Sequence, residues 1–300
     1  MSMPDELPTL SVVGAVNDTK GDFEYLFSLY QEMLEMPDRF CLDCTYASFL
    51  RQNAVAFLGG MVLMARRQGK EVSWKKPTDG KVISNLLRNE FGVLFEEKAI
   101  PRIYNAILFK HYTDYKDEEI ISDFLYENWL QPHWIDVSDE LKQLIVGRVA
   151  EIYMNAFTHS QSAIGVTSCG QYYPNLKELK LTIVDFGVGI PSNVRAFLKN
   201  DNISSEECMR WAFADGHTTA TDSNISRGIG LGMLDRFVRL NQGKLEIYSD
   251  NAYTCIDKDG QRFEGREQTF RGTIVNITLN CKEVAYLLAS ENEMSEDSVF

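Results

Sequence analysis

Two side chains of one predicted helix could hold a metal ion and activate a water molecule. Glu151 and Asn155 lie in the sequence EIYMNAFTH, which ends at His159. Residues four apart on a helix share one face, so the carboxylate and the carboxamide are expected side by side. Carboxamide and carboxylate oxygens bind Mg²⁺, and a carboxylate can orient a water molecule and take its proton. By itself the pair is weak evidence, because exposed helices often carry such spacing.

A second group of residues could bind a nucleotide base. Asp185, Gly187 and Gly189 follow the apolar segment Leu179–Val184, which predicts a strand that ends at the acid. A carboxylate there can accept a hydrogen bond from the exocyclic amine of a base. Glycines let the backbone approach a ligand closely, although they also suit an ordinary tight turn.

A third group has the composition of an anion site. Arg227, Gly228, Gly230 and Gly232 precede a helical pattern that runs to Leu240. The first N–H groups of a helix have no partner within it, so they can bind phosphate, and glycines leave them uncovered. A Rossmann-type site is excluded, because no strand directly precedes these glycines and their spacing departs from G-x-G-x-x-G.

In this order and spacing, the three groups resemble the nucleotide-binding motifs of the histidine-kinase-like (GHKL, or Bergerat-fold) ATPases. Gly272-Thr273 resembles the G-T pair of that family, and the resemblance spans about residues 137–281. It implies ATP and Mg²⁺ as ligands, with Glu151 as the catalytic base and Asn155 as the metal ligand. The cofactor-binding residues that it implies are Asp185, as the adenine partner, and Gly187, Gly189, Arg227, Gly228, Gly230, Gly232 and Thr273.

One position departs from that family. Sensor kinases often carry a basic residue where this chain has Thr158, and Arg227 is the candidate to replace its charge. The polar segment Asp215–Arg227 has few apolar anchors, so it is expected to be a mobile lid that becomes ordered when phosphate binds.

The elements that must position these residues predict an α+β scaffold. Ser138 is expected to cap a long helix that ends near His159. Strands are expected at Leu179–Val184, Lys244–Ser249, Tyr253–Asp257, Gln261–Phe263 and Gly272–Leu279. The resemblance implies that these elements form a two-layer α/β sandwich.

The first part of the chain alternates strand and helix patterns, which predicts an α/β domain. Strands are expected at Thr9–Val16, Arg39–Cys44 and Lys70–Trp74, and helices at Asp22–Met36, Gln52–Gln68 and Gly80–Phe91.

This half resembles, more loosely, the STAS domain of anti-sigma-factor antagonists. The resemblance is carried by Phe40–Leu50 (FCLDCTYASFL), by the apolar helix that contains Gly59-Gly60, and by Gly69 with the three residues after it. Where that family has an Asp-Ser-Ser-Gly turn, this chain has Arg51-Gln52-Asn53-Ala54, so the phosphorylatable serine is missing. We therefore expect this half to receive a conformational signal and not a phosphoryl group, with the helix surface Gln52–Arg67 as its docking face.

The expected organisation has four parts, namely a STAS-like domain (1–98), a connector (99–136), an ATP-binding domain (137–283) and an acidic tail (284–300). Within the connector, Arg102–Lys110 predicts a strand and Lys116–Leu130 an amphipathic helix.

Composition limits the partners. A formal net charge of −13 argues against general binding of nucleic acids, because such binding needs clustered Lys and Arg. No apolar segment is long enough to span a bilayer and the N-terminus lacks a signal-peptide pattern, so a cytoplasmic protein without membrane contact is expected.

The six cysteines are scattered, and the Cys41/Cys44 pair lacks a second pair or a nearby histidine to complete a zinc site.

Together these features predict an ATP- and Mg²⁺-binding regulatory protein with slow ATP hydrolysis. Its nucleotide state would reach a protein partner through the lid or the STAS-like domain. Fast ATPases of the superfamily continue into a second domain that supplies a lysine, whereas a short acidic segment follows the last predicted strand here. Two alternatives stay open: a serine- or histidine-directed protein kinase of the anti-sigma or sensor type, and a nucleotide-binding switch without hydrolysis. A homodimer is also left open.

Overall fold

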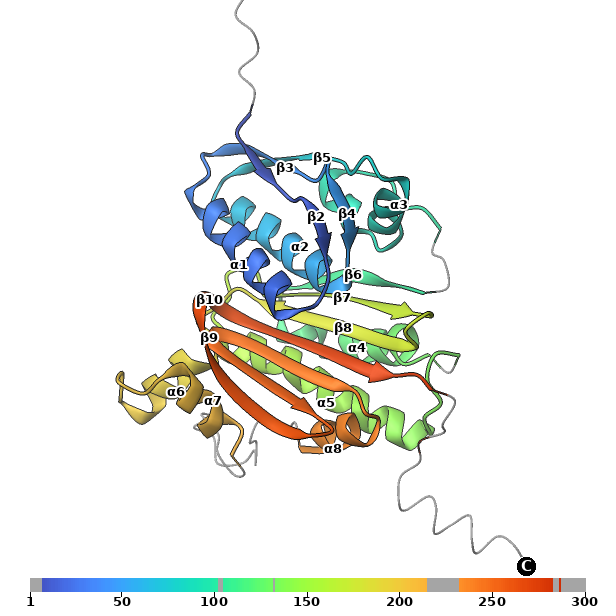
Figure 1. The fold of residues 1–300 in the computed structure, drawn as a ribbon, viewed down its shortest axis with the longest axis vertical. Coiled ribbons are helices and arrows are strands. Elements are labelled where there is room, and N and C mark those ends of the chain that lie inside the picture. Colours follow the sequence, from blue (N-terminus) through green and yellow to red (C-terminus); the bar gives the residue numbers. More distant parts are fainter. Residues whose placement is uncertain (1–6, 102–104, 132, 215–231, 283–285, 287–300) are drawn as a thin grey trace, which may run out of the picture.

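The computed structural model describes residues 7–101, 105–131, 133–214, 232–282 and 286. The chain folds as a mixed α/β protein with several sheets (Figure 1). The first part contains β1 (Thr9–Ser11), β2 (Gly14–Val16), α1 (Lys20–Glu35), β3 (Arg39–Asp43), β4 (Ala47–Leu50), α2 (Gln52–Arg67), β5 (Glu71–Lys75), α3 (Gly80–Arg88) and the 3₁₀ turn η1 (Phe91–Phe95). The second part contains β6 (Ala106–Tyr112), η2 (Tyr115–Asp117), α4 (Glu118–Phe124), the π-helical turn η3 (Leu125–Trp129), α5 (Asp139–His159), β7 (Val166–Tyr173), β8 (Glu178–Asp185), α6 (Ile190–Leu198), α7 (Ser205–Ala212), α8 (Gly232–Leu240), β9 (Lys244–Asp257) and β10 (Gly260–Asn280).

Two small parallel sheets form the first part. Strands β1, β3 and β5 make one of them, in that order, and β2 pairs with β4 in the other. The single strand expected at Thr9–Val16 is therefore divided between two sheets. Gly14, at φ +71°, marks the division, since only glycine adopts such a backbone angle freely. Helix α1 starts two residues earlier than expected, because Thr19 and Asp22 cap its N-terminus reciprocally.

The second part is built on one antiparallel sheet in the order β6-β7-β8-β10-β9. Strand β6 lies in the segment expected as a connector and forms one edge of this sheet. The four short C-terminal strands expected from the sequence are two long strands instead. Register shifts between Gly265, Phe270 and Thr273 let β10 bend without leaving the sheet.

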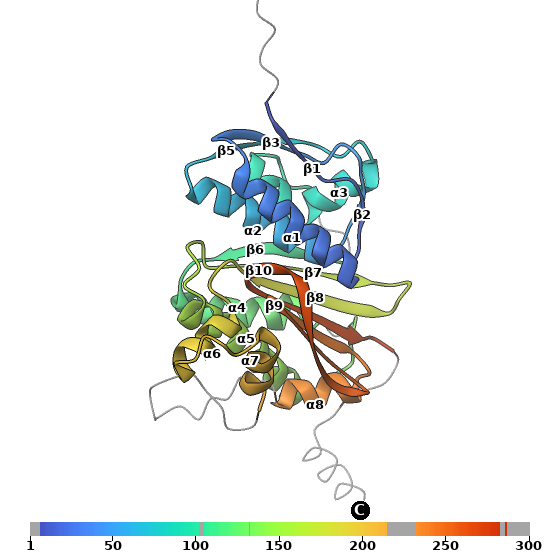
Figure 2. The same cartoon turned by 60° about the vertical axis from the view of Figure 1, so that its left-hand side comes forward.

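Helices cover both faces of this sheet (Figures 1 and 2). One core lies on the side of α4, α5 and α8 and includes Ile145, Ile183 and Phe237. The other core joins α1 and α2 to the opposite face and includes Phe57 and Val184. Strand β8 is buried on both sides: Leu179, Leu181 and Ile183 lie in the core on the α5 side, and Val184 lies in the core on the α2 side.

Helix α2 does not offer a free surface. Twelve of its sixteen residues are buried, and the hydroxyl of Thr167 on β7 donates to the carbonyl of Ala56 at 3.0 Å. The expectation that Gln52–Arg67 is an open docking face is therefore wrong, because the sheet of the same chain covers it. At the start of the helix, Gln52 donates to Thr182 and Asn276 on the sheet, at 3.3 and 3.2 Å.

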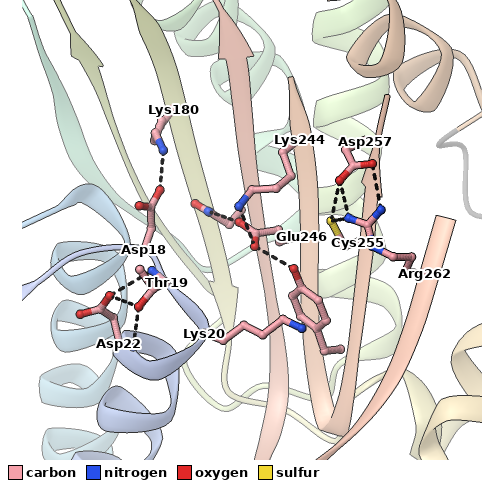
Figure 3. Close-up of polar contacts among 12 residues, drawn as sticks. Asp18, Thr19, Lys20, Asp22, Lys180, Lys244, Glu246, Cys255, Asp257 and Arg262 are labelled. Carbon is pink, nitrogen blue, oxygen red and sulfur yellow. Dashed lines mark hydrogen bonds and ion pairs between the residues drawn. The ribbon is translucent and has the colours of Figure 1, made fainter. Parts of the chain in front are cut away.

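Charged side chains add to this contact at the start of α1 (Figure 3). The Asp18 carboxylate accepts from Lys180 of β8 at 2.5 Å and from Arg51 at 2.8 Å. On the edge strand β9, buried Glu246 contacts Lys244 at 3.0 Å and accepts from the hydroxyl of Tyr253 at 2.9 Å. The first part of the chain is thus joined to the sheet by polar contacts as well as by an apolar core.

In the described ranges, no helix combines the length and the apolar composition that crossing a membrane requires.

Candidate functional site

Helix α5 presents the two predicted metal- and water-binding side chains. It begins after Ser138, whose hydroxyl accepts from the N–H of Leu141 at 3.3 Å, and it ends at His159, so both predicted limits are confirmed. Glu151 and Asn155 lie one turn apart and are both half-buried. Arg148 donates to the Glu151 carboxylate at 2.7 Å, a contact that the sequence analysis missed although the two residues have helical i,i+3 spacing.

Asp185 is the last residue of β8 and is buried. In the sheet it faces Val166 of β7 and Thr273 of β10. Burial raises the pKa of its carboxyl to about 7, and hydrogen bonds from Gly187 and Thr273 oppose that rise. The Gly187 N–H donates to the carboxylate at 2.9 Å. A carboxylate in this setting is poorly solvated, and its described partners are hydrogen-bond donors and not cations.

Gly187 packs directly on the C-terminal end of α5. A Cβ at this position would lie 1.9 Å from the Ser160 carbonyl oxygen, which also accepts the Val188 N–H at 2.7 Å. Nearby, the Asn193 amide donates to the carbonyl of His159 at 2.9 Å. The loop after Asp185 is therefore fixed to the helix that carries Glu151 and Asn155.

Gly189 and Gly272 meet on the other side of this loop. Gly189 has φ +80° and opens α6, and a Cβ there would lie 2.8 Å from the Ser249 hydroxyl. A Cβ at Gly272 would lie 2.3 Å from the Asp185 carbonyl. Together with Gly187, these glycines are required by packing within the protein itself, so their presence alone does not indicate a ligand.

Ser249 connects the parts of this site, and the sequence analysis missed it. Its hydroxyl donates to the Gly272 carbonyl at 2.8 Å and accepts the Ile190 N–H at 2.9 Å. It also lies beside Thr273 in the β9–β10 register. No motif contains this serine, and only its register with Thr273 could have identified it.

Part of the expected phosphate side lies outside the described residues. This applies to Arg227, Gly228, Gly230 and the expected lid. Gly232 is the first residue of α8, and this helix packs on the same sheet face as α5 through Leu234 and Phe237.

The structure thus brings Asp185, Gly187, Gly189 and Thr273 together at the ends of β8 and β10, next to the end of α5. A cavity of about 160 Å³ lies near the same helix end, but no predicted site residue lines it; Asp114, Phe157 and Ser160 are among the residues that do. Within the described part of the chain, no three His, Cys, Asp or Glu side chains form a group able to hold a metal ion.

The comparisons with known proteins add no assignment to this geometry: no family model matches the chain, and no curated protein matches it either.

Proposed function

We propose that the second part of the chain binds an adenine nucleotide with Mg²⁺ in the manner of the histidine-kinase-like ATPases. The observation that carries this proposal is the buried carboxylate of Asp185 at the end of β8, held by Gly187 and Thr273. Burying a charge without a cation is costly. An exocyclic amine of a base would donate to this carboxylate and favour its ionised form.

The neighbouring helix supports the rest of the site. Asn155 would hold Mg²⁺, and Glu151, one turn away, would orient the water molecule for slow hydrolysis of ATP. The bound metal would add positive charge where the phosphates lie. Backbone N–H groups at the N-terminus of α8, which begins at Gly232, would bind the phosphates. The nucleotide state would then pass to a protein partner through the lid, in a signalling role, while the STAS-like part stays packed on the sheet.

One observation favours a switch without hydrolysis as the second candidate. The carboxylate of Glu151 is held by Arg148 at 2.7 Å, so one of its oxygens is already engaged and less available to orient a water molecule. In such a switch ATP would bind and change the protein, and no ADP would form.

The experiment is a titration of the full chain with ATP, with and without Mg²⁺, by calorimetry. Asp185→Asn is the central variant, because it keeps the shape of the side chain and places an N–H₂ group where the base amine would donate. Glu178→Gln, at the opposite end of the same strand, is the matched control. We expect binding by the wild type and by Glu178→Gln, and its loss in a folded Asp185→Asn protein.

Two results would decide against the proposal. One is a folded wild-type chain that does not bind ATP at millimolar concentration. The other is an Asp185→Asn variant with wild-type affinity, which would show that this carboxylate does not contact the base. Release of ADP from the wild type would then separate the ATPase from the switch.

A further inference from the structure

Phe186 follows Asp185 directly, yet its side chain belongs to the other face of the sheet. Its ring is 5 % exposed and lies among aromatic rings of the first part of the chain. The ring centroids are 5.2 Å from Tyr30 of α1 and 5.3 Å from Phe57 of α2. A third ring, that of Phe270 on β10, lies at 5.4 Å. The Phe186 ring therefore belongs to the core between the sheet and the first part of the chain, and the adjacent Asp185 is not part of that core.

The backbone of Phe186 lies inside the turn that orients Asp185. The Gly187 N–H donates back to the Asp185 carboxylate at 2.9 Å, so Phe186 is the middle residue of this turn. On the other side, Gly187 packs closely on Ser160, which directly follows α5: an added Cβ would lie 1.9 Å from the Ser160 carbonyl oxygen, and this oxygen accepts the Val188 N–H at 2.7 Å. A shift of the Phe186 ring must therefore move the turn, and with it the carboxylate, since packed interiors transmit small displacements.

Helix α2 controls where the Phe186 ring can lie. Its two adjacent glycines each accept one aromatic ring from the second part of the chain. A Cβ at Gly60 would lie 2.2 Å from the Phe186 ring, and a Cβ at Gly59 would lie 2.3 Å from the ring of Phe109 on β6. The two contacts are equally close, but only Phe186 adjoins the nucleotide-binding carboxylate.

We propose that Phe186 is a positioning residue through which the packing of α2 sets the affinity of the Asp185 site for adenine nucleotides. This inference rests on the proposed function. It assigns the first part of the chain a role within that function: α2 holds Asp185 in its binding orientation through the Gly60–Phe186 contact. Anything that displaces α2 from the sheet would then change nucleotide affinity without touching the nucleotide.

The test uses the two glycines as a matched pair in the full chain. Gly60→Ala and Gly59→Ala add the same methyl group to the same helix, and both should lower the melting temperature. Only Gly60→Ala should weaken Mg-ATP binding, by about fivefold or more, the lower end of measured couplings between sites. In the double variant Gly60→Ala/Phe186→Leu, the smaller side chain makes room for the methyl group, and the affinity should return to that of Phe186→Leu alone. The effect of Gly60→Ala on affinity should therefore disappear when residue 186 is leucine, whereas an effect that does not pass through the Phe186 ring would persist.

A second pair keeps the test decisive if Gly60→Ala fails to fold. Phe186→Leu and Phe109→Leu remove similar volumes from the two contacts, and again only the first should weaken ATP binding. Two results would overturn the inference. One is an equal loss of ATP affinity in both variants of either pair, and the other is wild-type affinity in Gly60→Ala or Phe186→Leu. A wild-type chain that binds no ATP would instead overturn the proposed function, and this inference with it.

Discussion

Thr273 hydrogen-bonds to the carboxylate of Asp185 through both its hydroxyl and its backbone N–H, from the strand that faces Asp185 in the sheet. Two donors from one residue hold an acid that burial alone would leave protonated. The balance leaves the carboxyl pKa at about 7, where a small change in its surroundings alters the fraction ionised.

The first prediction concerns pH and stability. The folded-state pKa of Asp185 is raised, so its protonated form favours folding at low pH, and this contribution is lost as pH rises through about 7. Asp185→Asn cannot ionise, so without nucleotide its stability advantage over the wild type should grow between about pH 4 and about pH 7 and then level off, at up to about 4 kcal/mol. Urea unfolding of both proteins across this pH range measures the difference. A difference that stays constant with pH would show that the acid is solvated.

The second prediction separates the two side chains of α5. Glu151→Ala should keep ATP affinity and lose turnover, because in the proposed function this residue orients water and does not contact the nucleotide. Asn155→Ala should lose the Mg²⁺-dependent part of binding. Calorimetry and ADP release measure the two quantities, with Glu140→Ala in the first turn of the same helix as the control. Equal loss of affinity in both variants would mean that the pair has one structural role.

The third prediction concerns Arg148. Removing this side chain by Arg148→Ala leaves the Glu151 carboxylate without its ion-pair partner and available to orient a water molecule, so turnover should rise. Half-exposed ion pairs are worth up to about 1 kcal/mol, so the rise should be about fivefold or less and the melting temperature should change little. Arg148→Lys keeps the charge and is the control. Turnover that falls with Arg148→Ala would indicate instead that the arginine itself contacts the nucleotide.

The fourth prediction concerns the charged contact between the start of α1 and the sheet. Burial raises the pKa of Asp18, but Lys180 and Arg51 outweigh burial, so the net pKa is lowered. Its stabilising contribution is therefore present above the ordinary carboxyl pKa and is lost as pH falls below it. At neutral pH, Asp18→Asn should cost about 3 kcal/mol, because it leaves the buried Lys180 with a weaker set of partners.

Urea unfolding at neutral pH measures that loss, and Asp38→Asn at an exposed position is the control. The gap between Asp18→Asn and the wild type should narrow as pH falls below about 4. An equal gap at low and neutral pH would exclude the ion pairs as its cause.

Much of the second part could be predicted from local patterns. Ser138 and the apolar spacing after it fixed the limits of α5, and the apolar run before Asp185 fixed the end of β8. These elements follow from capping and periodicity, which act over a few residues. The continuity of β9 and β10 could not be predicted, because bulges and pairing across the sheet override weak local signals near Asp250 and Phe270.

The position of α2 on the sheet was missed for a different reason. The sequence of this helix is apolar on nearly all sides, which is typical of a helix buried between two layers. This pattern indicates a buried helix, whereas the docking face at Gln52–Arg67 was expected from the resemblance to a STAS domain. No local pattern predicts that the Phe186 ring packs against α1 and α2, because a phenylalanine within D-F-G suits either core.

The aromatic rings that join the two parts have a consequence for how the chain can be divided. If the chain were cut before β6, the five-stranded sheet would stay complete, but Phe186, Tyr248 and Phe270 would be turned toward water, together with the buried polar groups of Lys180 and Asn276. Contiguous exposed apolar surface of this kind favours self-association. The second part of the chain is thus an unsuitable unit for separate expression or transfer to another protein, and the two parts are expected to be inherited, folded and degraded as one.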